Sequence, residues 1–98
     1  MHVIARKALK DAGEKFDIEP VLDAWFRIAT AASWHSLEDV RKTYATADGV
    51  TVGGKTYTVF NIGGNKFRLI VKIEYKYQKI FIKHVLTHKE YDKGGWKK

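Results

Sequence analysis

The chain has 98 residues, of which 45% are hydrophobic, and it carries a formal net charge of +7 without any cysteine. A chain of this length predicts a single domain spanning residues 1–98 with one modest core, which excludes a deeply enclosed active site. The lack of cysteine excludes disulfides, thiolate nucleophiles and cysteine-ligated zinc.

The charges near the N-terminus are not followed by a long apolar run. No segment approaches the roughly 18 apolar residues that a membrane-spanning helix needs. We therefore expect a cytoplasmic protein that has no signal peptide and no association with a membrane.

The first quarter of the chain predicts a short extended segment and then a helix. Val3 and Ile4 form the extended segment. From residue 5 onward, apolar side chains recur at helical spacing, with charged side chains on the other side. Gly13 marks the expected end of this helix, because glycine is common just beyond a helix C-terminus.

Two further helices are predicted before residue 45. Pro20 suits the first turn of the second helix, and Ser36 suits the N-cap of a short third helix that reaches about Tyr44. Trp25 and Trp34 are expected in the core. The apolar stripe of the second helix is formed by Val21, Leu22, Trp25, Ile28, Ala29 and Ala32.

The second half of the chain has the pattern of strands separated by glycine turns. Four strands are predicted, at residues 50–52, 55–62, 66–75 and 79–87. Gly53-Gly54 and Gly63-Gly64-Asn65 form the first two turns, and residues 94–98 form a loose tail. Helices followed by an antiparallel meander predict an α+β fold, in which the N-terminal helices pack on a mostly antiparallel β-sheet.

Alternation along the strands predicts which side chains share a face. In the strand 66–75, Arg68 and Lys72 point away from the helices. In the strand 79–87, Lys83 joins them, whereas His84 and His88 belong to the opposite set. Arg68, Lys72 and Lys83 would then form a cationic surface. The alternative is that they are only the solvated face of a one-sided sheet.

Basic residues are concentrated in the second half of the chain. Residues 51–98 carry eleven basic and three acidic side chains, whereas the first half carries nearly equal numbers of each sign. This asymmetry favours a polyanionic partner such as nucleic acid. The alternative is that the charge only maintains solubility.

The segment Thr87-His88-Lys89-Glu90-Tyr91-Asp92 combines an imidazole, an ammonium, a carboxylate and a phenol in six residues. All four groups can bind or release protons, and they follow directly after an apolar strand. In a basic protein, this combination indicates a surface that could cleave a phosphodiester without a metal ion.

A metal site is the alternative for the histidines of this region. His84, His88 and Asp92 recur at a spacing of four residues, which would place them on one face of a continuous helix. Residues 80–86 are rich in β-forming side chains, however, so a helix would have to begin inside a strand. We therefore predict no metal site and no cofactor.

Two motifs at this separation resemble a known family. Asn61-Ile62-Gly63-Gly64-Asn65-Lys66-Phe67-Arg68-Leu69, followed by Thr87-His88-Lys89-Glu90-Tyr91-Asp92, resembles the HigB-type toxins of the RelE/ParE superfamily, and the opening Met1-His2-Val3-Ile4 fits as well. The resemblance implies helices on an antiparallel sheet and an mRNA endonuclease that acts on translating ribosomes. It also implies a HigA-type antitoxin with a helix-turn-helix domain, bound in a higher-order hetero-oligomer.

The resemblance further implies the residues of the site. Arg68 matches the strand arginine, His88 and Tyr91 match the acid/base position near the end of the last strand, and Lys83 matches a second basic residue. These are the expected catalytic residues, with Tyr91 as a second acid/base group if neighbouring cations lower its pKa from about 10. RNA binding is expected from Lys66, Lys72, Lys89, Lys97 and Lys98.

The expected reaction is attack by the RNA 2′-hydroxyl on the adjacent phosphate, with Arg68 binding that phosphate and His88 transferring a proton. Two other functions stay open at this point. One is a ParE-like toxin that inhibits DNA gyrase, and the other is an RNA-binding module without catalysis, since one fold can support all three.

Overall fold

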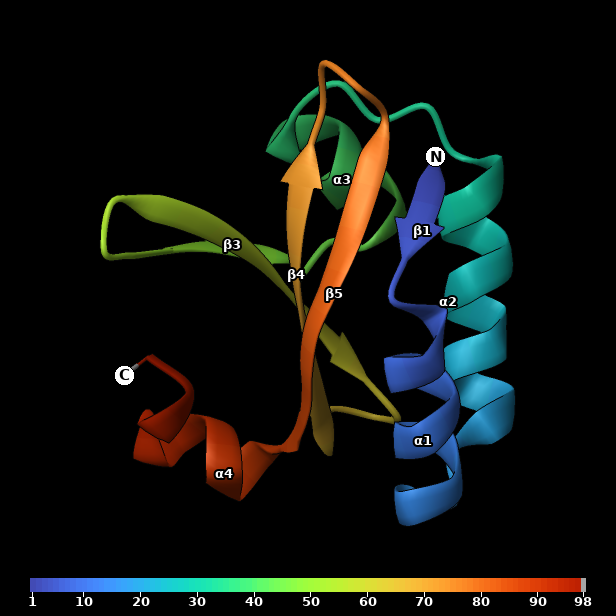
Figure 1. Cartoon of the computed structure of the whole chain (residues 1–98), viewed down its shortest axis with the longest axis vertical. Coiled ribbons are helices and arrows are strands. Elements are labelled where there is room, and N and C mark those ends of the chain that lie inside the picture. Colours follow the sequence, from blue (N-terminus) through green and yellow to red (C-terminus); the bar gives the residue numbers. More distant parts are fainter. Residues whose placement is uncertain (98) are drawn as a thin grey trace.

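The computed structural model describes residues 1–97 and contains a five-stranded mixed sheet with helices on both of its faces (Figure 1). The strand order is β1-β5-β4-β3-β2; β1 is parallel to β5 and the other pairs are antiparallel. The predicted α+β fold is therefore confirmed. In chain order the elements are β1 (His2–Ile4), α1 (Arg6–Phe16), α2 (Glu19–Ala31), α3 (Leu37–Thr43), β2 (Asp48–Val52), β3 (Lys55–Ile62), β4 (Phe67–Glu74), β5 (Lys79–Thr87), α4 (His88–Lys93) and the 3-10 helix η1 (Gly95–Lys97).

The main core lies between the sheet and the helices α1, α2 and α3. Trp25 is 1% exposed and meets the fully buried Phe60 edge to face, with ring centroids 5.5 Å apart. Trp34 stacks on the other side of this cluster, so both tryptophans are core residues as predicted. Ile28 was expected in the apolar stripe but is 41% exposed. No helix within residues 1–97 is both long enough and apolar enough to cross a bilayer.

Gly13 does not end the first helix, contrary to the prediction. The helix α1 continues to Phe16, and Asp17 caps it in the left-handed conformation at φ 56°. Gly13 is buried, and a Cβ atom at this position would lie 2.8 Å from Glu19 Cγ and 3.2 Å from Glu19 Cα. Glycine is needed here because the start of α2 approaches the backbone of α1 closely.

The turn between β3 and β4 forms as predicted. Gly63, Gly64 and Asn65 have φ values of 62°, 64° and 75°, a left-handed conformation that glycine and asparagine tolerate best. This turn brings Arg68 to the start of β4.

A β-bulge in β5 changes which of its side chains share a face. Ile70 pairs with His84 while Val71 pairs with Ile82, so Lys83 is an extra residue in β5. Beyond Lys83 the predicted assignment is therefore inverted. Val85 packs against the main core, whereas His84 lies on the opposite face with Arg68 and Ile70.

The end of the chain is not a loose tail over its described part. Residues 88–97 form α4 and η1, which lie on the side of the sheet opposite to α1 and α2, below the projecting β2–β3 hairpin (Figure 1). The His88 backbone N–H donates to Lys66 O at 2.9 Å, which joins the start of α4 to the β3–β4 turn. We call the sheet face on this side, away from α1–α3, the open face.

Candidate active site

The candidate site lies on the open face, at the end of the sheet where α4 begins. The strand register aligns Asp48, Val59, Ile70 and His84 across β2, β3, β4 and β5. Val59 is 3% exposed and Ile70 is fully buried, yet neither belongs to the main core cluster. The open face therefore has a small apolar centre of its own, covered by the C-terminal segment.

A capping box fixes the start of α4 immediately after β5. The Glu90 N–H donates to Thr87 Oγ1 and the Thr87 N–H donates to Glu90 Oε1, both at 3.1 Å. The bond from the Thr87 backbone holds the pKa of the Glu90 carboxyl below its ordinary value. With the helix start fixed in this way, His88, Tyr91 and Asp92 occupy defined positions at the edge of the open face.

His88 and Asp92 form a pair one helical turn apart. His88 Nδ1 lies 2.8 Å from Asp92 Oδ2, and both side chains are about half exposed, at 49% and 58%. A carboxylate at Nδ1 leaves Nε2 directed away from it, which suits a histidine that exchanges a proton at Nε2. His84 lies beside Trp96 instead, with ring centroids 6.4 Å apart. Within residues 1–97, no three His, Asp or Glu side chains are grouped to hold a metal ion.

Arg68 is held at the end of β4 that lies nearest α4. It is only 7% exposed, and its Nη1 donates to Asn65 O at 3.1 Å and to Phe67 O at 3.2 Å. Its Cζ lies 5.8 Å from the centroid of the Tyr91 ring. Within residues 1–97, no hydrogen-bond acceptor is found for Arg68 Nε and Nη2, and guanidinium donors of this kind suit an anion such as a phosphate.

The environment of Tyr91 favours its neutral form. Burial raises the pKa of Tyr91, the Asp48 and Asp92 carboxylates raise it further, and Arg68 opposes them only in part. The condition set for Tyr91, that neighbouring cations lower its pKa, is therefore not met. A phenol that stays protonated can donate a proton or a hydrogen bond, but it is poorly suited to act as a base.

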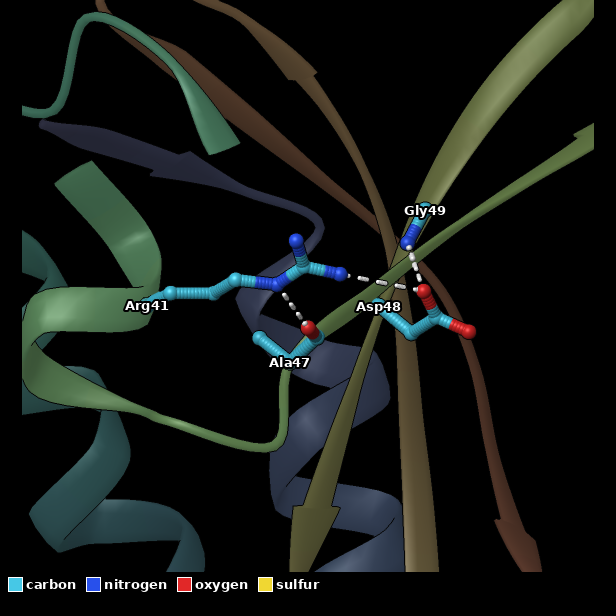
Figure 2. A network of polar contacts seen from close by, with 4 residues as sticks. All are labelled: Arg41, Ala47, Asp48 and Gly49. Carbon is cyan, nitrogen blue, oxygen red and sulfur yellow. Dashed lines mark hydrogen bonds and ion pairs between the residues drawn. The ribbon is translucent and has the colours of Figure 1, made fainter. Parts of the chain in front are cut away.

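Asp48 is braced at the start of β2 by a network that begins on α3 (Figure 2). Arg41 Nε donates to Ala47 O at 2.8 Å, and Arg41 Nη2 lies 3.3 Å from Asp48 Oδ1. The same carboxylate oxygen accepts from the Gly49 N–H at 2.9 Å. These contacts hold the Asp48 carboxylate near Tyr91 although the two residues belong to segments far apart in the sequence.

Three rings gather above the open face. Trp96 stacks on Tyr91 with centroids 5.5 Å apart and 17° between the planes, and it meets Tyr57 edge on at 6.1 Å. The sequence analysis gave Trp96 and Asp48 no place in the site, and it considered His88 and Asp92 together only as part of a metal site. Of these, only the contact between His88 and Asp92 could have been predicted from the sequence, because residues 88 and 92 have the spacing of neighbours on a helix.

Arg68, Lys72 and Lys83 do not gather into one cationic surface. Lys72 pairs with Glu74 at 3.6 Å, four residues along β4 from Arg68. Lys83 is exposed at the bulge, with its Nζ 5.8 Å from the Phe81 ring centroid. Arg68 pairs with Leu86 instead. Leu86 lies three residues beyond Lys83 on β5, so Lys83 is about 10 Å away along the strand.

The remaining predicted lysines surround the site. Lys66 lies in the β3–β4 turn, Lys89 on α4 and Lys97 in η1, and all three are exposed. Lys97 Nζ lies 5.7 Å from the centroid of the Trp96 ring. Lys98 falls outside the described residues. Together Lys66, Lys89 and Lys97 give a basic rim at the edge of the open face.

Comparison with known proteins identifies related sequences over nearly the whole chain. Residues 18–94 match the family model HigB_toxin, described as the RelE-like toxic component of a toxin-antitoxin system. The mRNA interferase toxin HigB of Escherichia coli K12 is 37% identical over 93 residues, which are 94% of this chain and 88% of that protein. The mRNA interferase HigB of E. coli O6:H1 is 28% identical over 94 residues, 95% of this chain and 90% of that protein.

Proposed function

Because this chain belongs to the HigB family of RelE-like toxins, we propose that it is an mRNA interferase, an endoribonuclease that inhibits translation by cutting mRNA. The observation that carries the proposal is the joint position of three groups at one end of the open face. These are a buried arginine with free donors, a phenol in contact with it, and a histidine paired with a carboxylate.

These groups can serve the self-cleavage chemistry of RNA. His88 Nε2 removes the proton of a 2′-hydroxyl, and that oxygen attacks the adjacent phosphorus. Tyr91 donates its phenolic proton to the departing 5′-oxygen, so the products are a 2′,3′-cyclic phosphate and a 5′-hydroxyl. Arg68 stabilises the additional negative charge on the phosphorane. The proposed reaction has a base, an acid and a cation from the protein, and therefore uses no metal ion.

The lysines have a supporting role in this proposal. Lys83 and Lys72 are too far along the sheet to share one phosphate with Arg68, so we assign them to the RNA backbone beyond the cleaved bond. Lys66, Lys89 and Lys97 would contact RNA phosphates at the rim of the site, and RNA binding by Lys98 stays a proposal from the sequence alone. Such contacts release counterions, so binding should weaken steeply as salt increases.

The ribosome would supply the orientation that this exposed site lacks. The groups of the site lie on an open sheet face, and His88 and Asp92 are each about half exposed. Holding reactants in line can contribute several kcal/mol of barrier reduction. We therefore propose that efficient cleavage requires mRNA that is already positioned on a translating ribosome.

The partner proposed for neutralisation is a HigA-type antitoxin with a helix-turn-helix domain. Support comes from the family, whose members are the toxic components of toxin-antitoxin systems. We propose that toxin and antitoxin associate in a higher-order hetero-oligomer.

The test is cleavage of a defined mRNA on translating ribosomes, with EDTA-treated free RNA as a control. The wild type, Arg68→Ala and His88→Ala are compared with the matched controls Arg27→Ala and His35→Ala, which lie outside the site. We expect ribosome-dependent cuts by the wild type and both controls, little cleavage of the free RNA, and a loss of at least about 100-fold in the two site variants.

Two results would contradict the proposal. Loss of RNA affinity in Arg68→Ala, when the wild type itself shows no turnover, would indicate an RNA-binding module. No cuts under any condition, together with inhibition of supercoiling by DNA gyrase, would indicate the ParE-like function.

A further inference from the structure

Trp96 is the residue through which the end of the chain packs on the open face. Its ring lies 6.1 Å from the Tyr57 ring on β3 and 6.4 Å from the His84 ring on β5. The strand β4 runs between β3 and β5. Trp96 therefore reaches across β4 and contacts the strands on both of its sides.

The apolar centre of the open face lies below this ring. Ile70 on β4 is directly opposite His84 and Val59, and both Ile70 and Val59 are almost completely buried. Because the helices α1–α3 cover the other face, a separate cover is needed here. Trp96 is placed to supply it, since it spans the sheet from Tyr57 to His84.

The same ring also contacts the proposed proton donor. Trp96 stacks almost parallel on Tyr91, with 17° between the planes, and Tyr91 in turn lies 5.8 Å from Arg68 Cζ. The backbone connection between Tyr91 and Trp96 passes through Gly94 in the left-handed conformation and then Gly95, neither of which has a side chain to restrain it. The stack thus joins Tyr91 to the sheet through Trp96, in addition to the capping box that fixes the start of α4.

The indole N–H of Trp96 has no part in this arrangement. Trp96 Nε1 is buried and has no acceptor within residues 1–97. A buried donor without a partner opposes folding, so the ring contacts must outweigh it. It follows that the position needs an aromatic ring of adequate size and does not need a hydrogen bond from tryptophan.

We propose that Trp96 is a positioning residue for RNA cleavage, which seats the C-terminal segment on the open face and thereby holds Tyr91 against Arg68. This inference rests on the proposed function of the site. Trp96 acts through Tyr91 and is not itself required to touch the RNA. Its loss should then reduce turnover by misplacing Tyr91, because a displacement of about 1 Å can lower a rate by roughly 100-fold.

The test is a double-mutant cycle measured as ribosome-dependent cleavage. Trp96→Ala should lower the turnover number by about 10-fold to 100-fold with little change in KM. Trp96→Phe, which keeps a ring, should stay within roughly threefold of the wild type. In the Tyr91→Phe background, Trp96→Ala should have almost no further effect, because the proton donor is already absent. Tyr77→Ala, at a ring that is 62% exposed in the β4–β5 turn, is the control.

A base-stacking role for Trp96 would give different results. It would raise KM rather than lower turnover, and its full effect would persist in Tyr91→Phe. Either result would overturn the proposal, as would equal losses in Trp96→Phe and Trp96→Ala. If Trp96→Ala does not fold, Trp96→Leu takes its place in the cycle.

Amide-hydrogen exchange of residues 88–93 separates this inference from the proposed function. In Trp96→Ala we expect exchange in α4 to accelerate by at least about tenfold while exchange in β4 stays unchanged. Unchanged exchange in α4 would overturn the positioning role. If the wild type cuts no RNA, the proposed function fails, but the exchange experiment still decides whether Trp96 seats α4.

Discussion

His88 Nδ1 and Asp92 Oδ2 lie 2.8 Å apart on consecutive turns of α4. The contact orients the imidazole, and in its neutral form it favours the tautomer that carries the proton on Nδ1 and leaves Nε2 as an acceptor. A short helix that begins directly at the end of β5 thus presents an oriented imidazole at the edge of the open face.

Asp92→Asn should lower the cleavage rate by about 10-fold to 100-fold. This is less than the roughly 10²–10⁴-fold that general acid-base catalysis contributes, because His88 itself is retained. Asparagine keeps the shape but can present its amide group to Nδ1, which favours the wrong tautomer. The rate on ribosomes and the ¹⁵N shifts of the His88 ring measure the two effects. Asp23→Asn is the matched control because Asp23 also pairs at i,i+4, with Arg27. Equal rates for the two variants would exclude a role for Asp92.

Arg68→Lys should lower the cleavage rate by about 10²–10³ although the charge is retained. Lysine lacks the planar set of donors that binds carbonyls on one side and a phosphate on the other. Loss of the Nη1 contacts with Asn65 O and Phe67 O should also reduce the free energy of unfolding by about 1–2 kcal/mol. Denaturant unfolding and cleavage are measured together, with Arg27→Lys as the control. A rate within threefold of the wild type would remove Arg68 from the proposed mechanism.

Asp48→Asn should lower the pKa of Tyr91 toward its ordinary value, because one of the carboxylates that raise it is removed. Ultraviolet titration of phenolate, with the Tyr91→Phe signal subtracted, measures the shift. At neutral pH Tyr91 is protonated in both proteins, so cleavage should change little there. The alkaline decline in rate should begin at a lower pH in Asp48→Asn. A Tyr91 titration that does not move would show that Asp48 is not coupled to it.

The raised pKa of Tyr91 also has a consequence for stability. The folded state binds this proton more tightly than the unfolded state. The contribution of Tyr91 to stability is therefore complete below the unfolded pKa of about 10, and it is lost as the pH rises from there toward the folded pKa. Comparing unfolding of the wild type and Tyr91→Phe across this range should show a steeper alkaline loss in the wild type.

Gly13→Ala should destabilise the protein by roughly 1 kcal/mol. Alanine favours a helix interior by about 1 kcal/mol over glycine, but overpacking typically costs about 1–3 kcal/mol. Here the new Cβ would lie 3.2 Å from the Glu19 backbone, which cannot turn aside as a side chain can. Thermal unfolding measures the difference, with Gly95→Ala as the control because a Cβ there meets nothing within 4 Å. A higher melting temperature for Gly13→Ala would show that the helix ends can move apart.

Elements that have local causes could be predicted from the amino-acid sequence. The strand 79–87 follows from alternation, and the turn at residues 63–65 follows from the backbone freedom of Gly63 and Gly64. Residues 87–92 could be identified as a candidate proton-transfer segment because the relevant side chains are adjacent in the chain. Arg68 and the motif around it were found because the family resemblance depends on the same local stretches.

Features that depend on contacts between distant segments of the sequence could be found only in the folded protein. The alternation of side chains cannot show the bulge at Lys83, because the bulge arises from the pairing of β5 with β4. The bulge reverses the face of every later residue in β5. The role of Gly13 depends on the approach of Glu19. The raised pKa of Tyr91 depends on its burial and on Asp48, which Arg41 braces from α3. The burial of a group and the charge around it depend on all the atoms near it in space. Those atoms come together only when the chain folds.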